Sequence, residues 1–234
     1  MNAAPGPEQV PAGLLRRYLA WSLDMLVPVA LALAACAGRI AAASARATAA
    51  LEAIAQRMAQ AMVDALVHGT GALALARGWL RYPAWREAVT ALSGAVADAV
   101  VAPALLAALL ALAWFAGFEA SPLQATPGKR ALGLRVVDAR GARLALGRAA
   151  LRHLAGTLSW LSLNLGHLLA ALPPRHQALH DRLAGTRVLQ RAGARLPAWS
   201  LAWLGLQLLA AVAAGACLLA ATQQAIERAF DALL

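Results

Sequence analysis

The sequence predicts an all-α membrane protein, a bundle of about three to four transmembrane helices, and three observations lead to this prediction. Hydrophobic residues make up 61% of the 234 residues and charged residues only 14%, whereas a soluble domain is about half apolar and a quarter charged. The apolar residues gather in runs about as long as the roughly 20 residues that cross a bilayer. Most Lys and Arg residues lie between these runs, and the net charge is +10.

Four apolar stretches are candidates for membrane helices. The first, residues 19–37, contains a single charge, Asp24, and the second, residues 99–118, contains none. The third covers residues 154–172 and the fourth residues 198–221. Each is close to the length of a membrane-crossing helix.

The chain divides into an N-terminal segment, a membrane domain and a C-terminal helix. Residues 1–13 are polar and rich in proline, and we expect them to be disordered. Residues 14–189 form the membrane domain, which contains an external helical insertion at residues 38–98. Residues 190–234 add a further transmembrane helix and a tail.

The insertion is predicted to contain an amphipathic helix. Over residues 41–67, apolar side chains recur at helical spacing, while charged and amide side chains interrupt the run too often for a simple span. Such a helix lies on the membrane or packs on the bundle. Beyond it, Trp79, Tyr82, Pro83 and Trp85 are typical of an interfacial turn.

The distribution of positive charge predicts the orientation. Arg16 and Arg17 precede the first stretch, and six Lys and Arg residues follow the second between positions 129 and 148. Two spans place both groups on one side, and the excess of basic residues on cytoplasmic loops predicts a cytoplasmic N-terminus. Anionic lipid head groups are the expected partners of these loops. No basic stripe with interleaved aromatic residues is present, so we expect no nucleic-acid partner.

The course of the third stretch has two interpretations. Five Arg residues follow it between positions 175 and 195, and a single crossing places this basic loop outside. Re-entry with a turn near residues 164–166 places both basic loops in the cytoplasm, and we favour this alternative because of the charge rule.

Short β-like runs in the basic loops predict a small cytoplasmic hairpin or sheet. Residues 134–138 and 143–146 flank a turn-like segment at 139–142, which is the pattern of a hairpin. Residues 186–189 form another such run, and an edge strand on the same side is a suitable partner for it.

Asp24 is a candidate functional residue because a carboxylate at the centre of a span costs about 2.5–3.5 kcal/mol on insertion scales. One interpretation is a carboxylate that carries a proton or a cation. The other is a structural anchor that pairs with Arg17, seven residues earlier on the same helix face, or with a loop arginine. Both interpretations remain open at this point.

Residues 126–130 contain Gly and Lys but lack the spacing of a phosphate-binding loop. We therefore expect Lys129 and Arg130 to face lipid phosphates or internal acids. The segment is expected to cap the short stretch that follows the second span.

A second polar cluster is centred on His176 and His180, which face the same way if the segment is helical. Asp181 and Arg182 follow directly, and Arg152 lies near the start of the third stretch. Because the spacing supplies no third ligand, we predict a hydrogen-bonded cluster of His, Asp and Arg side chains, with no metal site and no cofactor.

These segments form three motifs whose order resembles a known family. The motifs are Arg17-x-x-Ala20-x-x-x-Asp24, then residues 126–138 with the sequence TPGKRALGLRVVD, and then residues 180–188 with the sequence HDRLAGTRV. The chain resembles the RDD family of bacterial membrane proteins, which is named for an arginine and two aspartates. The resemblance covers about residues 14–37 and 99–189, so the insertion and the last helix lie outside it.

The resemblance implies that the named residues are Arg17, Asp24 and Asp181, with Arg16 as an alternative for the arginine. It also implies a multi-pass protein of the bacterial inner membrane. The role of the family is largely unassigned, and exchange of monovalent cations for protons has been proposed for some members.

Two functional hypotheses follow. The first is a small secondary transporter that uses Asp24 and Asp181, which requires a homo-oligomer because few other polar residues lie in the spans. The second is a non-transporting scaffold or accessory subunit for a membrane partner, in which the charges are structural. No nucleophile with a base and an orienting partner can be assembled, so we do not expect an enzyme.

Overall fold

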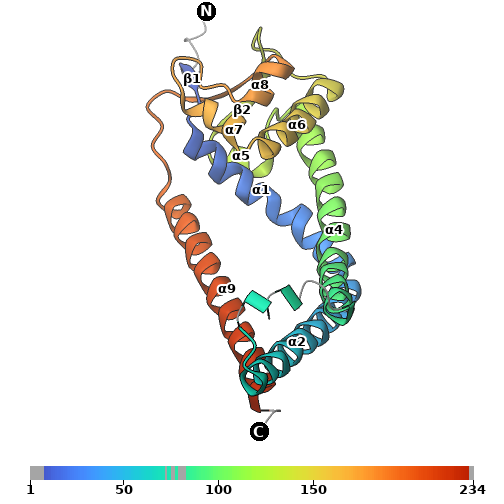
Figure 1. Cartoon of the computed structure of the whole chain (residues 1–234). Coiled ribbons are helices and arrows are strands. Elements are labelled where there is room, and N and C mark those ends of the chain that lie inside the picture. The colour runs from blue at the N-terminus through green and yellow to red at the C-terminus, as the bar shows by residue number, and fades with distance from the viewer. Residues whose placement is uncertain (1–7, 72, 75–76, 79–82, 232–234) are drawn as a thin grey trace, which may run out of the picture. The chain divides into compact units, whose positions relative to one another are not determined.

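The computed structural model describes residues 8–71, 73–74, 77–78 and 83–231. Their elements, shown in Figure 1, are β1 (Gln9–Pro11), α1 (Leu14–Ala35), α2 (Ala37–His68), α4 (Pro83–Ala120), α5 (Pro127–Ala131), β2 (Leu134–Asp138), α6 (Leu146–Leu161), α7 (Leu165–Leu168), η1 (Leu169–Ala171), α8 (Leu179–Ala184), β3 (Thr186–Arg191) and α9 (Ala198–Asp231). The mainly helical architecture with a small sheet confirms the predicted fold class.

Three of the described helices are long and apolar enough to cross a membrane. They are Leu14–Ala35, Pro83–Ala120 and, within α9, Ala198–Arg228. These helices confirm the prediction for the first, second and fourth stretches, because a run of about 20 apolar residues suffices for a 30 Å hydrocarbon core.

The chain folds as two compact units, and α1, α4 and α9 each continue from one into the other. The first unit comprises residues 1–32 and 105–206, and the second comprises residues 33–104 and 207–234. The functional residues predicted from the sequence all belong to the first unit.

The first unit is organised around the N-terminal part of α1, on which the sheet and the short helices gather (Figure 1). Its core contains Leu19 from α1, Leu132 after α5, Val136 from β2 and Val188 from β3. At the start of α9, the Trp203 indole N–H donates to the Ser22 hydroxyl on α1 at 3.0 Å.

The sheet has the order β1-β3-β2, with both pairs antiparallel. Pairing of β2 with β3 agrees with the expectation for residues 186–189. The predicted second hairpin strand at 143–146 is wrong, because the Asp138 carboxylate accepts hydrogen bonds from the Arg140 and Ala142 N–H groups and closes a tight turn. The chain then enters α6 at Leu146.

The expected disorder of residues 1–13 is wrong for the described part of that segment. Residues 9–11 form β1, and the Ala12 N–H donates to the Val188 carbonyl at 2.9 Å. The unpaired edge of β3 supplies main-chain hydrogen bonds that the polar composition of the segment did not reveal. Residues 1–7 lie outside the described residues.

The third apolar stretch does not form a continuous span. Helix α6 ends at Leu161, and the backbone then takes positive φ angles at Leu163 (51°) and Asn164 (66°). Strand β2 precedes this stretch and β3 follows it, and the two strands pair. Because its two ends meet in one sheet, the stretch turns back instead of crossing, as the favoured interpretation predicted.

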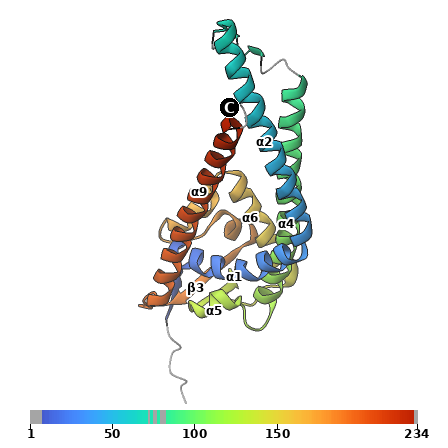
Figure 2. The same cartoon turned by 90° about the horizontal axis from the view of Figure 1, so that it is seen from below.

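The second unit is built from α2, the first part of α4 and the end of α9. Figure 2 shows α2 running beside α4, and Arg46 forms an ion pair of 2.8 Å with Asp98 between them. Helix α2 begins four residues before the predicted helix and ends at Gly69, whose left-handed φ of 66° terminates it. Of the predicted interfacial turn, Trp79 and Tyr82 lie outside the described residues, whereas Pro83 begins α4 and Trp85 lies in its first turn.

Candidate functional site

Five charged side chains from five helices form a buried network in the first unit. We call it the charge network; its members are Arg17 (α1), Glu119 (α4), Lys129 (α5), Arg152 (α6) and Asp181 (α8). Their side chains are between 0% and 11% exposed. Buried charges of this kind require partners, because an uncompensated charge in a low-dielectric interior is strongly unfavourable.

Asp181 is held by two arginines. Its Oδ2 atom accepts from Arg17 Nη1 at 2.5 Å, and its Oδ1 atom accepts from Arg152 Nε at 3.0 Å. The same carboxylate accepts the Ala178 N–H at 3.1 Å, which fixes it at the start of α8. Arg16 instead donates to the main-chain carbonyls of Leu132 and Ala194, so Arg17 is the arginine that meets an aspartate.

Glu119 is the member of the network that the sequence analysis missed. It is 1% exposed, and it accepts from Arg152 Nη1 at 2.7 and 2.8 Å and pairs with Lys129 Nζ at 2.9 Å. The Lys129 ammonium also lies 4.5 Å from the centre of the Phe115 ring, in a cation–π contact. The sequence did contain a signal for Glu119, because it is a lone carboxylate directly after the uncharged run at 99–118.

Asp24 occupies a separate site, which we call the Asp24 site. Its carboxylate accepts the Gly128 N–H at 2.7 Å and the Thr126 hydroxyl, and the Trp114 indole N–H lies 3.5 Å away. Asp24 therefore meets residues 126–128, and the predicted pairing with Arg17 is wrong. The two sites are adjacent because Gly128 belongs to one and Lys129 to the other.

Glycine is required at position 128 by a close approach of the backbone. A Cβ atom there would lie 2.9 Å from the Asp24 carboxyl and well inside van der Waals contact of the Ala20 carbonyl oxygen. Thr126 and Gly128 of this segment thus supply hydrogen-bond donors to the Asp24 carboxylate. Lys129 faces the internal acid Glu119, which was one of its two expected environments.

The remaining predicted residues lie at the edge of this arrangement. His180 Nε2 lies 3.4 Å from Arg152 Nη2 and 3.5 Å from Asp181 Oδ1. Arg130 and Arg182 are exposed. Among the described residues, no group of three or more His, Cys, Asp and Glu side chains has an arrangement suited to a metal ion.

His176 and His180 do not share a helix face, contrary to the expectation from their spacing. Helix α8 begins only at Leu179, and His176 has a positive φ of 46°. Its ring nitrogen Nδ1 lies 3.0 Å from the Ala170 carbonyl oxygen. Pro173 and Pro174 explain the break, because proline lacks the N–H and the conformational freedom that a continuing helix needs.

The electrostatic environment keeps the charge network ionised and keeps His180, which lies beside it, neutral. Burial alone raises the pKa of Asp181, but the positive charges of Arg152 and Arg17 outweigh it and hold that pKa well below its usual range. Burial, followed by the charge of Arg152, lowers the pKa of His180 to about 3. At neutral pH the site therefore contains fixed ion pairs beside an uncharged imidazole.

These shifts predict that the protein loses stability in mild acid. The unfolded chain protonates His180 near pH 6.5, whereas the folded chain does not until about pH 3. The unfolded state thus binds more protons as the pH falls, and stability declines by roughly 1 kcal/mol per pH unit below pH 6. Lowering of the Asp181 pKa acts in the same direction at lower pH.

Thermal unfolding of the detergent-purified protein between pH 8 and pH 4 measures this effect. We expect a flat Tm above pH 7, a decline below pH 6, and a shallower decline in His180→Gln. Exposed His68 supplies the matched control, so His68→Gln is expected to follow the wild-type curve. A wild-type Tm that stays flat down to pH 4 contradicts the prediction.

The fold and the site define a class: a multi-helix membrane protein with a small sheet, in which buried ion pairs join the spans to short helices. The sequence pattern of the RDD family matches residues 11–185, and the chain belongs to the RDD family.

The chain is also similar to the uncharacterized protein YxaI of Bacillus subtilis (strain 168), with 31% identity over 87 residues. The match covers 37% of this chain and 57% of YxaI, so the chain spans little more than half the length of that relative. No solved structure matches the chain.

Proposed function

We propose that this RDD protein is a non-transporting membrane scaffold or accessory subunit in which the charge network is structural. The observation that carries the proposal is that both carboxylates of the network are already held by two cations each. A transport carboxylate must exchange its partner for an ion in every cycle. Here that exchange would expose buried charges that stabilise one another, which is strongly unfavourable.

The distribution of charge supports an orientation for this scaffold. Residues 121–195 carry twelve Lys and Arg but only two Asp, and such an excess is typical of the cytoplasmic side. The proposal therefore places the sheet and the N-terminus in the cytoplasm, against anionic lipid head groups, and the protein in the bacterial inner membrane. It includes no enzymatic activity.

The end of α2 offers a surface for a membrane partner or for a second copy of the chain. Leu66 is 83% exposed and Val67 is 74% exposed, and Met62 and Val63 lie exposed one turn earlier. Clustered exposed apolar side chains are typical of interaction surfaces. In the proposed orientation this end of α2 lies on the external side.

A second candidate function, exchange of a monovalent cation for a proton, is favoured by one observation at the Asp24 site. The donors that the structure gives to the buried Asp24 carboxylate are neutral: a hydroxyl, a main-chain N–H and an indole N–H. A carboxylate held by neutral groups can take up a proton without breaking an ion pair.

Ion flux in proteoliposomes separates the two candidates. We expect well-folded wild-type protein to leave an imposed pH gradient intact when sodium, lithium or potassium is added, as protein-free vesicles do. Asp24→Asn is the paired variant, because an asparagine can still accept from Gly128 through its oxygen. Dissipation of the gradient by the wild type but not by Asp24→Asn would overturn the scaffold proposal and establish exchange through Asp24.

A further inference from the structure

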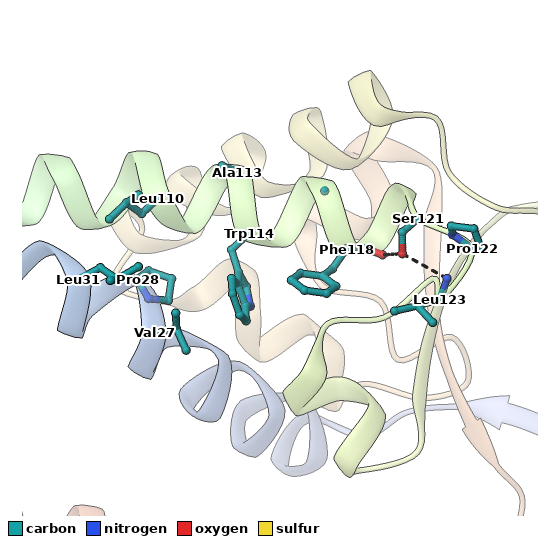
Figure 3. Close-up of a pocket in the computed structure, with 11 residues that line it drawn as sticks. Val27, Pro28, Leu31, Leu110, Ala113, Trp114, Phe118, Ser121, Pro122 and Leu123 are labelled. Carbon is teal, nitrogen blue, oxygen red and sulfur yellow. Dashed lines mark hydrogen bonds between the residues drawn. The ribbon is translucent and has the colours of Figure 1, made fainter.

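A groove of about 620 Å³ lies between α1 and α4 in the first unit. Figure 3 shows Trp114 projecting from α4 toward Val27 and Pro28 of α1, with Phe118 beside it. The two rings contact each other at a centroid distance of 4.8 Å and form one wall. The loop at residues 121–123 closes one end. The groove is therefore apolar along its length and meets polar main chain at that end.

The length and position of the groove match one leaflet of a bilayer. Along α4 its lining extends from Leu110 to Ser121. Eleven residues of helix rise about 16 Å, and half of the hydrocarbon core is about 15 Å. The uncharged run of α4 at residues 99–118 ends directly before Glu119, so we place the closed end where the span leaves the hydrocarbon region.

A cation is hydrogen-bonded to the residue that directly follows the lining of this closed end. Gln124 follows the lining residue Leu123, and its side-chain oxygen accepts from Arg135 Nε at 2.8 Å. The Nη2 atom of Arg135 also donates to this oxygen. The Arg135 side chain is exposed, so the Nη1 side of its guanidinium is available to a second acceptor. A guanidinium binds phosphate oxygens through paired N–H donors.

From these observations we infer that the groove binds one acyl chain of an anionic phospholipid, whose phosphate is bound by Arg135. The apolar walls suit a hydrocarbon chain, the length suits a single leaflet, and the charge at the closed end suits an anionic head group. Because the site depends on α1 and α4 as spans and not on the scaffold role, it is independent of the function proposed above.

The chain offers a substitution that fills the groove without disturbing its walls. Gly117 lines the groove, and a Cβ atom at this position meets nothing within 4 Å. A leucine there points into open space and occupies the room of the acyl chain. Gly215 on α9 has the same free space but lies outside the groove, so Gly215→Leu is the matched control.

Native mass spectrometry of the detergent-purified protein, titrated with phosphatidylglycerol or with phosphatidylcholine of the same chains, tests the inference. We expect one phosphatidylglycerol per chain, bound about tenfold more weakly by Gly117→Leu and by Arg135→Gln, and unchanged in Gly215→Leu. Ala113→Leu, at a second lining position, serves if Gly117→Leu does not fold.

Equal binding of the two lipids, or unchanged binding in both groove-filling variants, would overturn the inference. Self-association of the wild type that phosphatidylglycerol does not displace and that Gly117→Leu abolishes would also overturn it, because a second copy of the chain would then be the occupant.

Discussion

Replacing Arg152 with glutamine is expected to lower the free energy of unfolding by roughly 3–5 kcal/mol, the usual effect of removing one partner from a buried ion pair. Arg152 is the residue that connects the two halves of the charge network. Its Nη1 atom donates to Glu119 at 2.7 Å and its Nε atom donates to Asp181 at 3.0 Å. Both carboxylates are at most 1% exposed, so water cannot replace the lost donors.

The loss is large because the structure around Arg152 depends on its charge. The two carboxylates hold its pKa above the ordinary arginine value even though burial alone lowers it. Without the cation, Lys129 remains for Glu119 and Arg17 remains for Asp181, but two negative charges then share two cations in place of three. Glutamine keeps much of the size of the side chain, so packing changes contribute less than the missing charge.

Thermal and chemical unfolding in detergent, together with the yield of folded protein, measure this effect. Arg148→Gln is the matched control, since Arg148 is also on α6 but is 49% exposed and lies 3.5 Å from Asp138. Exposed pairs of this kind contribute at most about 1 kcal/mol. An Arg152→Gln protein no less stable than Arg148→Gln would show that the network does not stabilise the fold.

Replacing Gly128 with alanine is expected to lower the free energy of unfolding by about 3–5 kcal/mol, the sum of overpacking and of a lost hydrogen bond to a charged group. The added Cβ meets the Ala20 carbonyl oxygen and the Asp24 carboxyl. Because the first of these is main chain, α5 must move away from α1. The Gly128 N–H then leaves Asp24, whose buried carboxylate loses a donor.

Unfolding of Gly128→Ala in detergent, compared with Gly147→Ala on α6, tests this prediction. Position 147 has no atom within 4 Å of an added Cβ, and alanine is favoured over glycine in a helix by up to about 1 kcal/mol. The control is therefore expected to be neutral or slightly more stable. Equal stability of the two variants would mean that α5 does not hold Asp24 in the way the structure shows.

Local sequence patterns were sufficient to predict that the spans exist and that turns and short strands lie between them. The length of an apolar run reports membrane crossing directly, which is why α1, α4 and α9 were predictable. The turn near Asn164 and the strand-like runs at 134–138 and 186–189 were predictable because each has a local chemical signature. The incorrect second hairpin strand at 143–146 has the same origin, because a local pattern does not identify which segment a strand pairs with.

The partners within the site required the tertiary structure. Arg17 and Asp181 are 164 positions apart, and no local pattern specifies which arginine meets which aspartate. Asp24 looked like a partner of Arg17 on the same helix, yet the folded chain gives it Gly128 instead.

The sequence by itself thus determined that this chain has apolar helices long enough to enter the membrane, and which polar residues stand out. It did not fix the helix ends, because α4 begins at Pro83, well before the predicted residue 99, and α9 ends at Asp231, beyond the predicted residue 221. Only the tertiary structure decided how those residues pair, brought Glu119 into the network and separated Asp24 from it. The physical reason is that hydrophobic periodicity is a property of neighbouring residues, whereas compensation of a buried charge depends on groups that folding brings together from distant segments.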